Sequence, residues 1–494
     1  MVYGLIDGLI EKALEAGLIE TVDEIYVRNQ VMHLLGLKTY PETSKKKNDT
    51  IPNLVEKLVE YAVEESIIED VLDDKEMLAA NIMNVFLPRP SEVNAAFYEK
   101  YEESPIAATD YFYSLSKNSN YIQMNRIAKN ISYKADTDYG QLDITINLSK
   151  PEKDPEQIRR EREMKQTGSY PKCLLCKENE GYAGRTGHPA RANHRIIPVP
   201  LSGENWYLQY SPYVYYNEHS ILLSEEHRDM KIDAKTFERL LLFVEKFPHY
   251  FIGSNADLPI VGGSILSHDH YQAGRYEFSM TAAQDEFTFS LPSHQDVKAS
   301  VVKWPLSVIR LRSTSIGSLV SAGNHILETW RSYSDDSIDV LAFTGETPHN
   351  TITPIARRRD GLYELDLVLR NNRTSEEHPM GIFHPHEDVH HIKKENIGLI
   401  EVMGLAVLPP RLKDELAAIQ QHLLGESAGV AEYHLDWVKE LKSQYGVLTD
   451  AKEAEAILQK ELGRKFARVL EDAGVLKTRD AFERFIASLN REDL

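Results

Sequence analysis

The residues with the most chemical potential in this sequence are two histidines one position apart, His268 and His270. They lie in the segment Gly262–Gln272, which reads GGSILSHDHYQ. A neutral imidazole can ligate a metal ion and can act as a nucleophile toward phosphorus. The paired glycines would let the backbone approach a ligand closely. The pattern fits equally well two polar strand residues that are hydrogen-bonded to their neighbours, so the segment alone leaves both interpretations open.

The elements next to this segment can also be predicted. The apolar run Leu258–Val261 predicts a strand that ends in a turn at the two glycines. Alternate residues of an extended chain point the same way, so His268 and His270 are expected to share one face.

The chain has only two cysteines, and these form a second group with chemical potential. Cys173 and Cys176 have the CxxC spacing of half a zinc site, which needs two further ligands. Two buried cysteines that behave as small apolar residues are the alternative. A redox pair is less favoured, because no thioredoxin-like βαβ pattern surrounds the motif.

Histidines elsewhere supply candidates for the missing ligands. The first choices are His227 and His268, while His219 and His194 compete for the third position. A Cys2His2 site of this kind would be closed and structural, and it would fix the loop beside the second histidine of the HDH pair.

Two further motifs near the C-terminal side carry weaker signals. His384-Pro385-His386 is followed by two acidic residues, a set that suits a second metal or a sugar-phosphate contact, or a plain polar surface loop. Arg357-Arg358-Arg359 precedes Asp360-Gly361 and could hold a phosphate. A basic hairpin turn exposed to water is the favoured interpretation of the arginines.

Length and composition limit the classes of protein to consider. The chain has 494 residues, of which 42% are hydrophobic and 27% are charged, as in a globular protein of two or three domains. Its formal charge of −20 argues against a nucleic-acid partner. The sequence contains no apolar run of about 18 residues, so no membrane span is expected. The N-terminus lacks the pattern of a secretory signal, so a cytoplasmic location is expected.

The elements that must position these residues follow from periodicity. Residues 1–118 look helical, Leu142–Leu148 alternates like a strand, and Glu156–Lys165 predicts a charged helix. Ala234–Lys246 predicts another helix, and helices return from about Lys413. Mixed helices and strands in this order indicate an α+β fold. Further strands are expected at Ile196–Pro200, Tyr213–Leu223, Val301–Arg312, Val340–Phe343 and Tyr363–Arg370.

Taken together, these motifs resemble the histidine-triad superfamily and, more narrowly, the galactose-1-phosphate uridylyltransferase family in its divergent, longer bacterial type. The matching motifs occur in the same order as in the family, and HDH occupies the position where the better-known branch has HPH. The residues that carry the resemblance are Cys173, Cys176, His227, Asn255, Gly263, Ser264, His268, His270, Gln272 and, in a second triad-like repeat, His384 and His386.

The resemblance implies an architecture and a set of partners. Two tandem histidine-triad-like domains, each an antiparallel sheet with helices, would occupy 119–300 and 301–425. A helical extension would precede them at 1–118, and helices would follow at 426–494. The implied partners are UDP-glucose, UDP-galactose and hexose 1-phosphates, with neither nucleic acid nor a membrane. The implied assembly is a homodimer, and the implied cofactor is a structural zinc ion.

The resemblance also implies a two-step reaction. His270 would attack the α-phosphorus of UDP-glucose and form a uridylyl-histidine, which galactose 1-phosphate then resolves. Gln272 would be its catalytic partner. The implied substrate contacts are Asn255, Gly263, Ser264, Ser267, Arg126 and Lys150.

Two other functions and one other nucleophile stay open at this point. A dinucleoside polyphosphate phosphorylase or hydrolase would use the same histidine, and a zinc-stabilised sugar-nucleotide-binding regulator would use none. His386 is the rival nucleophile, but no Gly-Gly-Ser precedes it and Glu387 follows it. We therefore expect His270 to carry the uridylyl group.

Overall fold

The computed structural model describes residues 2–41, 46–149, 170–263, 265–427 and 429–490. The expected helix Glu156–Lys165 and the site candidates Lys150 and Ser264 lie outside these residues. The chain divides into two compact units. The first consists of Met1–Lys129, Ser149–Val214 and Glu218–His227, and the second of Asn130–Leu148, Tyr215–Asn217 and Arg228–Leu494.

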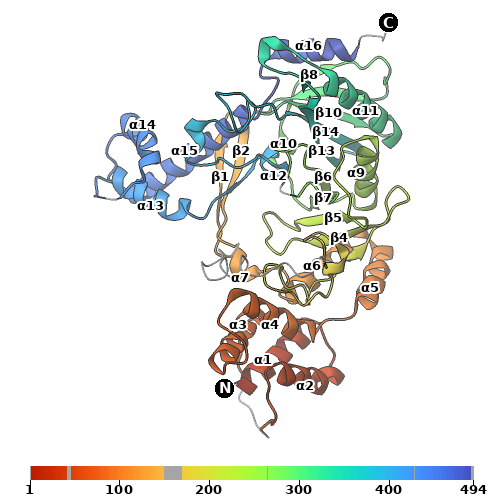
Figure 1. Cartoon of the computed structure of the whole chain (residues 1–494), viewed down its shortest axis with the longest axis vertical. Coiled ribbons are helices and arrows are strands. Elements are labelled where there is room, and N and C mark those ends of the chain that lie inside the picture. Colours follow the sequence, from red (N-terminus) through yellow and green to blue (C-terminus); the bar gives the residue numbers. More distant parts are fainter. Residues whose placement is uncertain (1, 42–45, 150–169, 264, 428, 491–494) are drawn as a thin grey trace. The chain divides into compact units, whose positions relative to one another are not determined.

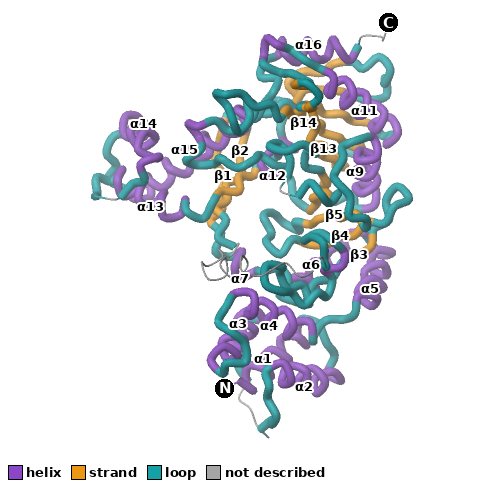
Figure 2. The backbone as a smooth tube through the Cα atoms, viewed as in Figure 1, coloured by secondary structure: helices purple, strands orange, loops and turns teal. Residues whose placement is uncertain are grey.

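The first unit begins with helices, as predicted. The described part of residues 2–118 contains helices and no strand (Figure 2). Local capping explains two of the boundaries: Thr50 accepts a hydrogen bond from Asn53 N, and Ser104 accepts one from Ala107 N. The helices are α1 (Val2–Glu15), α2 (Glu24–Leu34), α3 (Ile51–Glu64), α4 (Leu72–Asn84), α5 (Pro90–Glu103), α6 (Pro105–Asn118) and α7 (Met124–Ile127).

Three short antiparallel strands complete the first unit. They are β3 (Ile197–Pro198), β4 (Trp206–Tyr210) and β5 (Ser220–Ser224), in the order β3-β4-β5. The prediction of a strand over Tyr213–Leu223 is right only at its end, because the chain from Tyr213 to His219 is a loop. The 3-10 turn η2 (Lys177–Asn179) follows the CxxC motif.

The second unit contains a run of antiparallel strands. Their order is β7-β6-β13-β14-β10-β9-β8. Strand β14 confirms the prediction at Tyr363–Arg370, whereas the predicted strand Val301–Arg312 is broken by a turn into two. The bounds are β6 (Phe251–Gly253), β7 (His270–Gly274), β8 (Asp285–Phe289), β9 (Lys298–Val302), β10 (Val308–Ser313), β13 (Asn350–Arg359) and β14 (Leu362–Asn371).

Two helices, α9 (Ala234–Lys246) and α11 (Ile316–Ser332), pack against these strands and against each other (Figure 1). Helix α9 has the predicted bounds. Asp233 caps it by accepting from Thr236 N, and Phe237, Leu240 and Val244 lie on its buried face.

The second unit also contains a smaller sheet, a short hairpin of β11 (Phe343–Thr344) and β12 (Thr347–Pro348), and further helices. In the smaller sheet β1 (Ile131–Thr137) and β2 (Gly140–Ile146) form a hairpin, and β15 (Leu405–Leu408) runs parallel to β2. Strand β2 confirms the prediction at Leu142–Leu148. The remaining helices are α10 (Ser279–Ala282), α12 (Leu399–Val402), α13 (Leu412–Leu423), α14 (Leu435–Tyr445), α15 (Ala451–Asp472) and α16 (Arg479–Leu489). The α+β class is thus confirmed.

No helix in the described part of the chain is long and apolar enough to cross a membrane.

Candidate active site

His270 is the first residue of β7, and its side chain is buried. Its Nδ1 lies 2.7 Å from the backbone oxygen of His268. A carbonyl oxygen can only accept, so Nδ1 carries the proton and donates it to this bond. The other ring nitrogen, Nε2, therefore keeps its lone pair.

Burial also decides the charge of this ring. Burial lowers the pKa of His270 to about 4, although the bond to the His268 carbonyl acts in the opposite direction. The imidazole is therefore neutral at pH 7, with one nitrogen fixed as donor and the other available as nucleophile.

Neighbouring positions of β7 have different surroundings. Gln272 lies two residues beyond His270, on the same side of the strand, and pairs with Gly253 of β6. Tyr271 points the other way, and its hydroxyl accepts a hydrogen bond of 3.3 Å from Arg239 of α9. Tyr271 thus anchors the strand to a helix, while His270 and Gln272 share the opposite face.

The prediction of a strand over Leu258–Val261 is wrong. Strand β6 ends at Gly253, and residues 254–263 and 265–269 form turns and loop before β7 begins. Ile260 has a φ of 72° there, a left-handed conformation that β-branched residues rarely adopt. The apolar residues therefore belong to a tight turn, and of the two histidines only His270 is in a strand.

Asn255 holds this turn to another part of the second unit. Its Oδ1 accepts a 2.9 Å hydrogen bond from Leu399 N. Its Nδ2 lies so close to Gly263 that a Cβ there would be 2.7 Å away. Gly263 is thus needed for the close approach of an asparagine side chain. Ser267, the serine candidate that the structure describes, is exposed.

Asp269, between the two histidines, fixes the loop and received no role from sequence reasoning. Its backbone N–H donates to the Arg228 carbonyl at 2.8 Å, and its carboxylate lies 3.4 Å from the Arg228 guanidinium. Met230 N donates to Leu266 O at 2.8 Å. These bonds hold the loop along residues 228–230, directly after His227.

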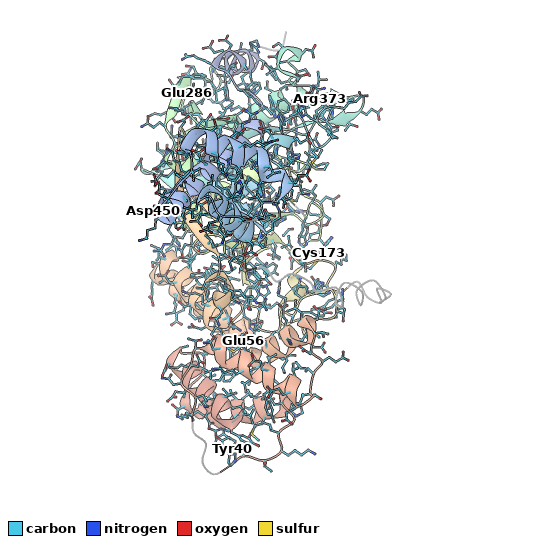
Figure 3. The ribbon with its side chains drawn as sticks, turned by 90° about the vertical axis from the view of Figure 1, so that its left-hand side faces the viewer. Tyr40, Glu56, Cys173, Glu286, Arg373 and Asp450 are labelled. Atoms are coloured by element: carbon cyan, nitrogen blue, oxygen red, sulfur yellow. The ribbon has the colours of Figure 1, made fainter. Side chains whose placement is uncertain are left out.

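Among the residues that the structure describes, one group of side chains could hold a metal ion: Cys173, Cys176, His227 and His268. Their ligand atoms all lie within 4.8 Å of one another. Sequence reasoning selected these four, and the alternatives His194 and His219 are not members. The position of Cys173 on its loop can be followed in Figure 3.

The distances between these ligand atoms suit zinc. The two sulfur atoms are 3.6 Å apart, and Cys176 Sγ lies 3.2 Å from His227 Nδ1. In a tetrahedral site with Zn–S bonds of about 2.3 Å, two sulfurs are about 3.8 Å apart. Burial raises the pKa of the Cys176 thiol to about 11, so a cation is required to hold it as a thiolate at neutral pH.

His194 has another use in the first unit. Its Nε2 lies 2.9 Å from Gln209 Oε1, and its ring stacks on Tyr121 with centroids 4.4 Å apart. The contacts explain why this buried histidine is no ligand.

Arg126 and two of the three hairpin arginines, Arg357 and Arg359, have carboxylate partners. Arg126 lies on α7 and donates to Glu76 Oε1 at 2.9 Å. Arg357 is buried on β13 and ion-pairs with Glu364 and Asp366. The prediction of an exposed basic turn is therefore wrong for Arg357, although Arg358 is exposed as expected.

The second HxH motif consists of His384 and His386, and His386 is held by contacts with neighbouring residues. His386 Nε2 lies 3.0 Å from the Ile382 carbonyl and so donates to it, while Nδ1 lies 3.6 Å from Asp472 of α15. His384 is buried, and burial lowers its pKa. Neither residue belongs to a metal-binding group within the described ranges.

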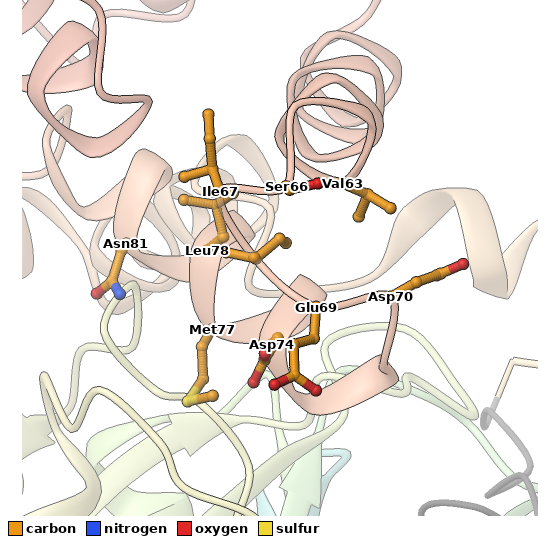
Figure 4. Close-up of a pocket in the computed structure, with 10 residues that line it drawn as sticks. Val63, Ser66, Ile67, Glu69, Asp70, Asp74, Met77, Leu78 and Asn81 are labelled. Carbon is orange, nitrogen blue, oxygen red and sulfur yellow. The ribbon is translucent and has the colours of Figure 1, made fainter.

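A pocket of about 700 Å³ in the first unit contains none of the predicted site residues. Figure 4 shows its lining, which includes the carboxylates of Glu69, Asp70 and Asp74 beside apolar residues of α3 and α4. Three carboxylates disfavour an anionic nucleotide. The pocket is therefore a poor candidate for a nucleotide site.

Comparison with known proteins places the whole chain. Models of the N-terminal and C-terminal domains of galactose-1-phosphate uridyl transferase match residues 17–229 and 243–439. The galactose-1-phosphate uridylyltransferase of Clostridium perfringens (strain 13 / Type A) is 54% identical over 492 residues, 98% of this chain and 99% of that protein. Galactose-1-phosphate uridylyltransferase 1 of Streptococcus pneumoniae serotype 4 is 51% identical over 489 residues, with the same coverage of 98% and 99%.

A solved structure with a weaker likeness is that of the yeast Ap4A phosphorylase Apa2. It is 13% identical, covers 65% of this chain and 88% of that one, and has a TM-score of 0.33, too low to carry an argument. The two domain models and the near full-length identity are decisive: the chain belongs to the galactose-1-phosphate uridyl transferase family.

Proposed function

We propose that this protein transfers a uridylyl group from UDP-glucose to galactose 1-phosphate, with His270 as the nucleophile. The family membership supports the reaction. The observation that carries the residue assignment is the 2.7 Å contact between His270 Nδ1 and the His268 carbonyl. This bond leaves Nε2 of a neutral imidazole as the nucleophilic atom.

The reaction proceeds in two displacements at the α-phosphorus. First, the Nε2 lone pair forms a bond to phosphorus, and the bond from phosphorus to the bridging oxygen breaks. Glucose 1-phosphate leaves with that electron pair, and a uridylyl-histidine remains. A phosphate oxygen of galactose 1-phosphate then attacks the same phosphorus, forming UDP-galactose and releasing the imidazole. One site thereby serves two similar sugar phosphates in turn, in a ping-pong order.

Donors near His270 would stabilise the charge on the nonbridging oxygens. Gln272 follows on the same face of β7 and is the proposed catalytic partner. Asn255 would contact the nucleotide through Nδ2, since its Oδ1 is bound to Leu399 N. The proposed further contacts are Gly263, Ser264, Ser267, Arg126 and Lys150.

The metal group would hold a structural zinc ion through Cys173, Cys176, His227 and His268. When bound, zinc supplies a fixed cross-link between distant parts of the chain and no reacting group. The proposal for His384 and His386 is a sugar-phosphate contact. The homodimer, the cytoplasmic location and the tandem triad-like domains stay predictions.

His386 is a weaker nucleophile than His270 for a geometric reason. Its Nε2 is the donor nitrogen, so the lone pair belongs to Nδ1, which faces the carboxylate of Asp472 at 3.6 Å. A carboxylate there would repel an incoming diphosphate.

The test is to incubate the full-length protein with UDP-glucose alone and to search for added mass on the peptide that contains His270. We expect a uridylyl adduct in the unmodified protein and in His386→Asn, and none in His270→Asn. Exchange of label between glucose 1-phosphate and UDP-glucose should fall at least about a thousandfold in His270→Asn. No adduct and no exchange in the unmodified protein would overturn the proposal. An adduct formed only from a dinucleoside polyphosphate would show that this compound, and not UDP-glucose, is the donor substrate.

A further inference from the structure

Asn179 lies against the CxxC turn and binds both of its cysteine residues through one amide group. Its Nδ2 is 2.8 Å from the carbonyl oxygen of Cys173 and 2.8 Å from that of Cys176. Carbonyl oxygens only accept, so the nitrogen end of the amide must face the turn. Both amide hydrogens are thereby used.

His188 holds the other end of this amide. Its Nε2 lies 2.7 Å from Asn179 Oδ1, and both side chains are buried. Since Oδ1 accepts, Nε2 of His188 donates. The backbone of His188 is in turn fixed by reciprocal bonds of 2.9 and 3.0 Å with Arg185. The orientation of Asn179 is thus set from both sides.

The consequence lies in the position of the two sulfur atoms. Two carbonyls bound to one nitrogen cannot rotate independently, so the peptide planes that follow Cys173 and Cys176 are fixed relative to each other. Leu175 N also donates to Cys173 Sγ at 3.4 Å. The sulfurs then lie 3.6 Å apart, close to the separation in a tetrahedral zinc site.

We propose that Asn179 and His188 are a positioning pair that pre-organises Cys173 and Cys176 for the metal ion. The inference rests on the proposed metal group, and it adds two residues that have no ligand atom in that group. Partners outside the ligand shell commonly change metal affinity by about ten- to a hundredfold when they are lost.

The alternative is that the pair only stabilises the fold of its loop. The two roles predict different metal affinities for a variant that still folds. A loop stabiliser lowers the melting temperature and leaves the metal affinity of the folded protein unchanged. A positioning pair changes the affinity and the ligand geometry as well.

The experiment measures zinc affinity of the full chain under reducing conditions, by competition with a chromophoric chelator. Cobalt substitution reports the geometry through its visible absorption bands. We expect Asn179→Leu to weaken zinc binding about ten- to a hundredfold and to alter the cobalt spectrum. The matched control is Asn193→Leu, which removes a buried amide bond of 2.9 Å to the Ser119 carbonyl, away from the cysteines. This control should keep the affinity of the unmodified protein.

A second pair of variants separates positioning from folding. His188→Phe removes the donor to Asn179, while His188→Gln replaces it with an amide N–H of similar reach, so only the glutamine variant should bind zinc almost normally. These variants carry the test if Asn179→Leu does not fold. Unchanged affinity in folded Asn179→Leu and His188→Phe would overturn the positioning role alone. Absence of zinc and cobalt binding in the unmodified protein would overturn the metal group and the positioning role together.

Discussion

Two buried histidines of this chain show how hydrogen-bond partners decide what an imidazole can do. His270 donates from Nδ1 to a carbonyl and keeps a lone pair on Nε2. His194 donates from Nε2 to Gln209 and packs its ring on Tyr121. Both are neutral at pH 7, because burial lowers the pKa of His270 to about 4 and that of His194 to about 3. His194 also keeps a lone pair, on Nδ1, but its ring is fully buried against Tyr121, so we place the proposed chemistry on His270 alone.

The low pKa of His194 predicts a loss of stability in acid. The unfolded chain would titrate this group near its ordinary value of 6.5, so the unfolded state binds the proton more readily than the folded state. Its effect on stability is absent above pH 6.5 and grows as the pH falls toward about 3. At pH 5 the loss amounts to about 2 kcal/mol.

The measurement is urea unfolding of the unmodified protein and of His194→Gln at pH 7.5 and at pH 5. The variant lacks the stacked ring and is less stable at pH 7.5, but it escapes the protonation cost. We therefore expect the gap between the two proteins to shrink at pH 5. A gap that stays constant or widens would contradict the pKa argument.

At this scale, sequence patterns led to the proposed ligands and the proposed nucleophile, but not to the residues that support them. His270 and the four metal-group residues stand in recognisable local text, such as CxxC and HDH. Asn179 donates to the backbone carbonyls of the CxxC turn, His188 donates to the Asn179 side chain, and Asp269 bonds to Arg228. Such contacts depend on how the loops fold, and no spacing within the sequence encodes them.

At the scale of elements, helices and strands were predicted correctly where capping residues and apolar periodicity were clear. Helix α9 has the predicted bounds because Asp233 caps it and its apolar residues recur at helical spacing. Strand β13 is absent from the sequence predictions, and Pro354 in its middle is a residue that argues against a strand. The structure places Pro354 where the pairing of β13 with β6 ends, at Ile355 and Ala356, so the missing N–H is tolerated.

A buried ladder of charges crosses β10, β13 and β14. Arg310 donates to both oxygens of Asp366, at 2.7 and 2.9 Å, and Arg357 ion-pairs with Asp366 and Glu364. Burial alone would raise the pKa of Asp366, but the two guanidinium groups outweigh it and hold that pKa well below its usual range. The Asp366 carboxylate therefore stays ionised and depends on its partners.

Removal of one arginine from this ladder should be costly. Arg357→Met would leave Glu364 and Asp366 buried with one cation fewer, and we expect a loss of about 3–5 kcal/mol in the free energy of unfolding. The matched control is the next residue on the strand, Arg358, whose exposed guanidinium lies 4.7 Å from the ring of Tyr363. Arg358→Met should cost about 1 kcal/mol or less. If denaturant unfolding gave equal losses of unfolding free energy for the two variants, the buried ion pairs would contribute no more than the exposed contact.

At the scale of the whole molecule, the metal group joins stretches that are far apart along the chain. Cys176 and His227 are 51 positions apart, and both lie before His268. Metal bound only by the folded state stabilises it by about 3 kcal/mol when free metal is a hundredfold above its dissociation constant. We therefore expect a strong chelator to lower the melting temperature and added zinc to restore it.

The control for this prediction is a double variant, Cys173→Ser with Cys176→Ser. It should melt at a lower temperature than the zinc-loaded protein, and the chelator should have no further effect on it. A melting temperature that does not respond to chelator in the unmodified protein would argue against a resident metal.

His268 belongs to the potential metal group through its ring, and through its backbone it contacts His270, the proposed nucleophile. The ring is one of four potential ligands, while the carbonyl oxygen of the same residue accepts the hydrogen bond from His270 Nδ1. Whatever loosens the ring also loosens the atom that aims Nε2. Depletion of metal should therefore lower the rate of uridylylation while the affinity for UDP-glucose stays nearly constant. A metal site that does not touch the phosphate would then control the rate of the reaction.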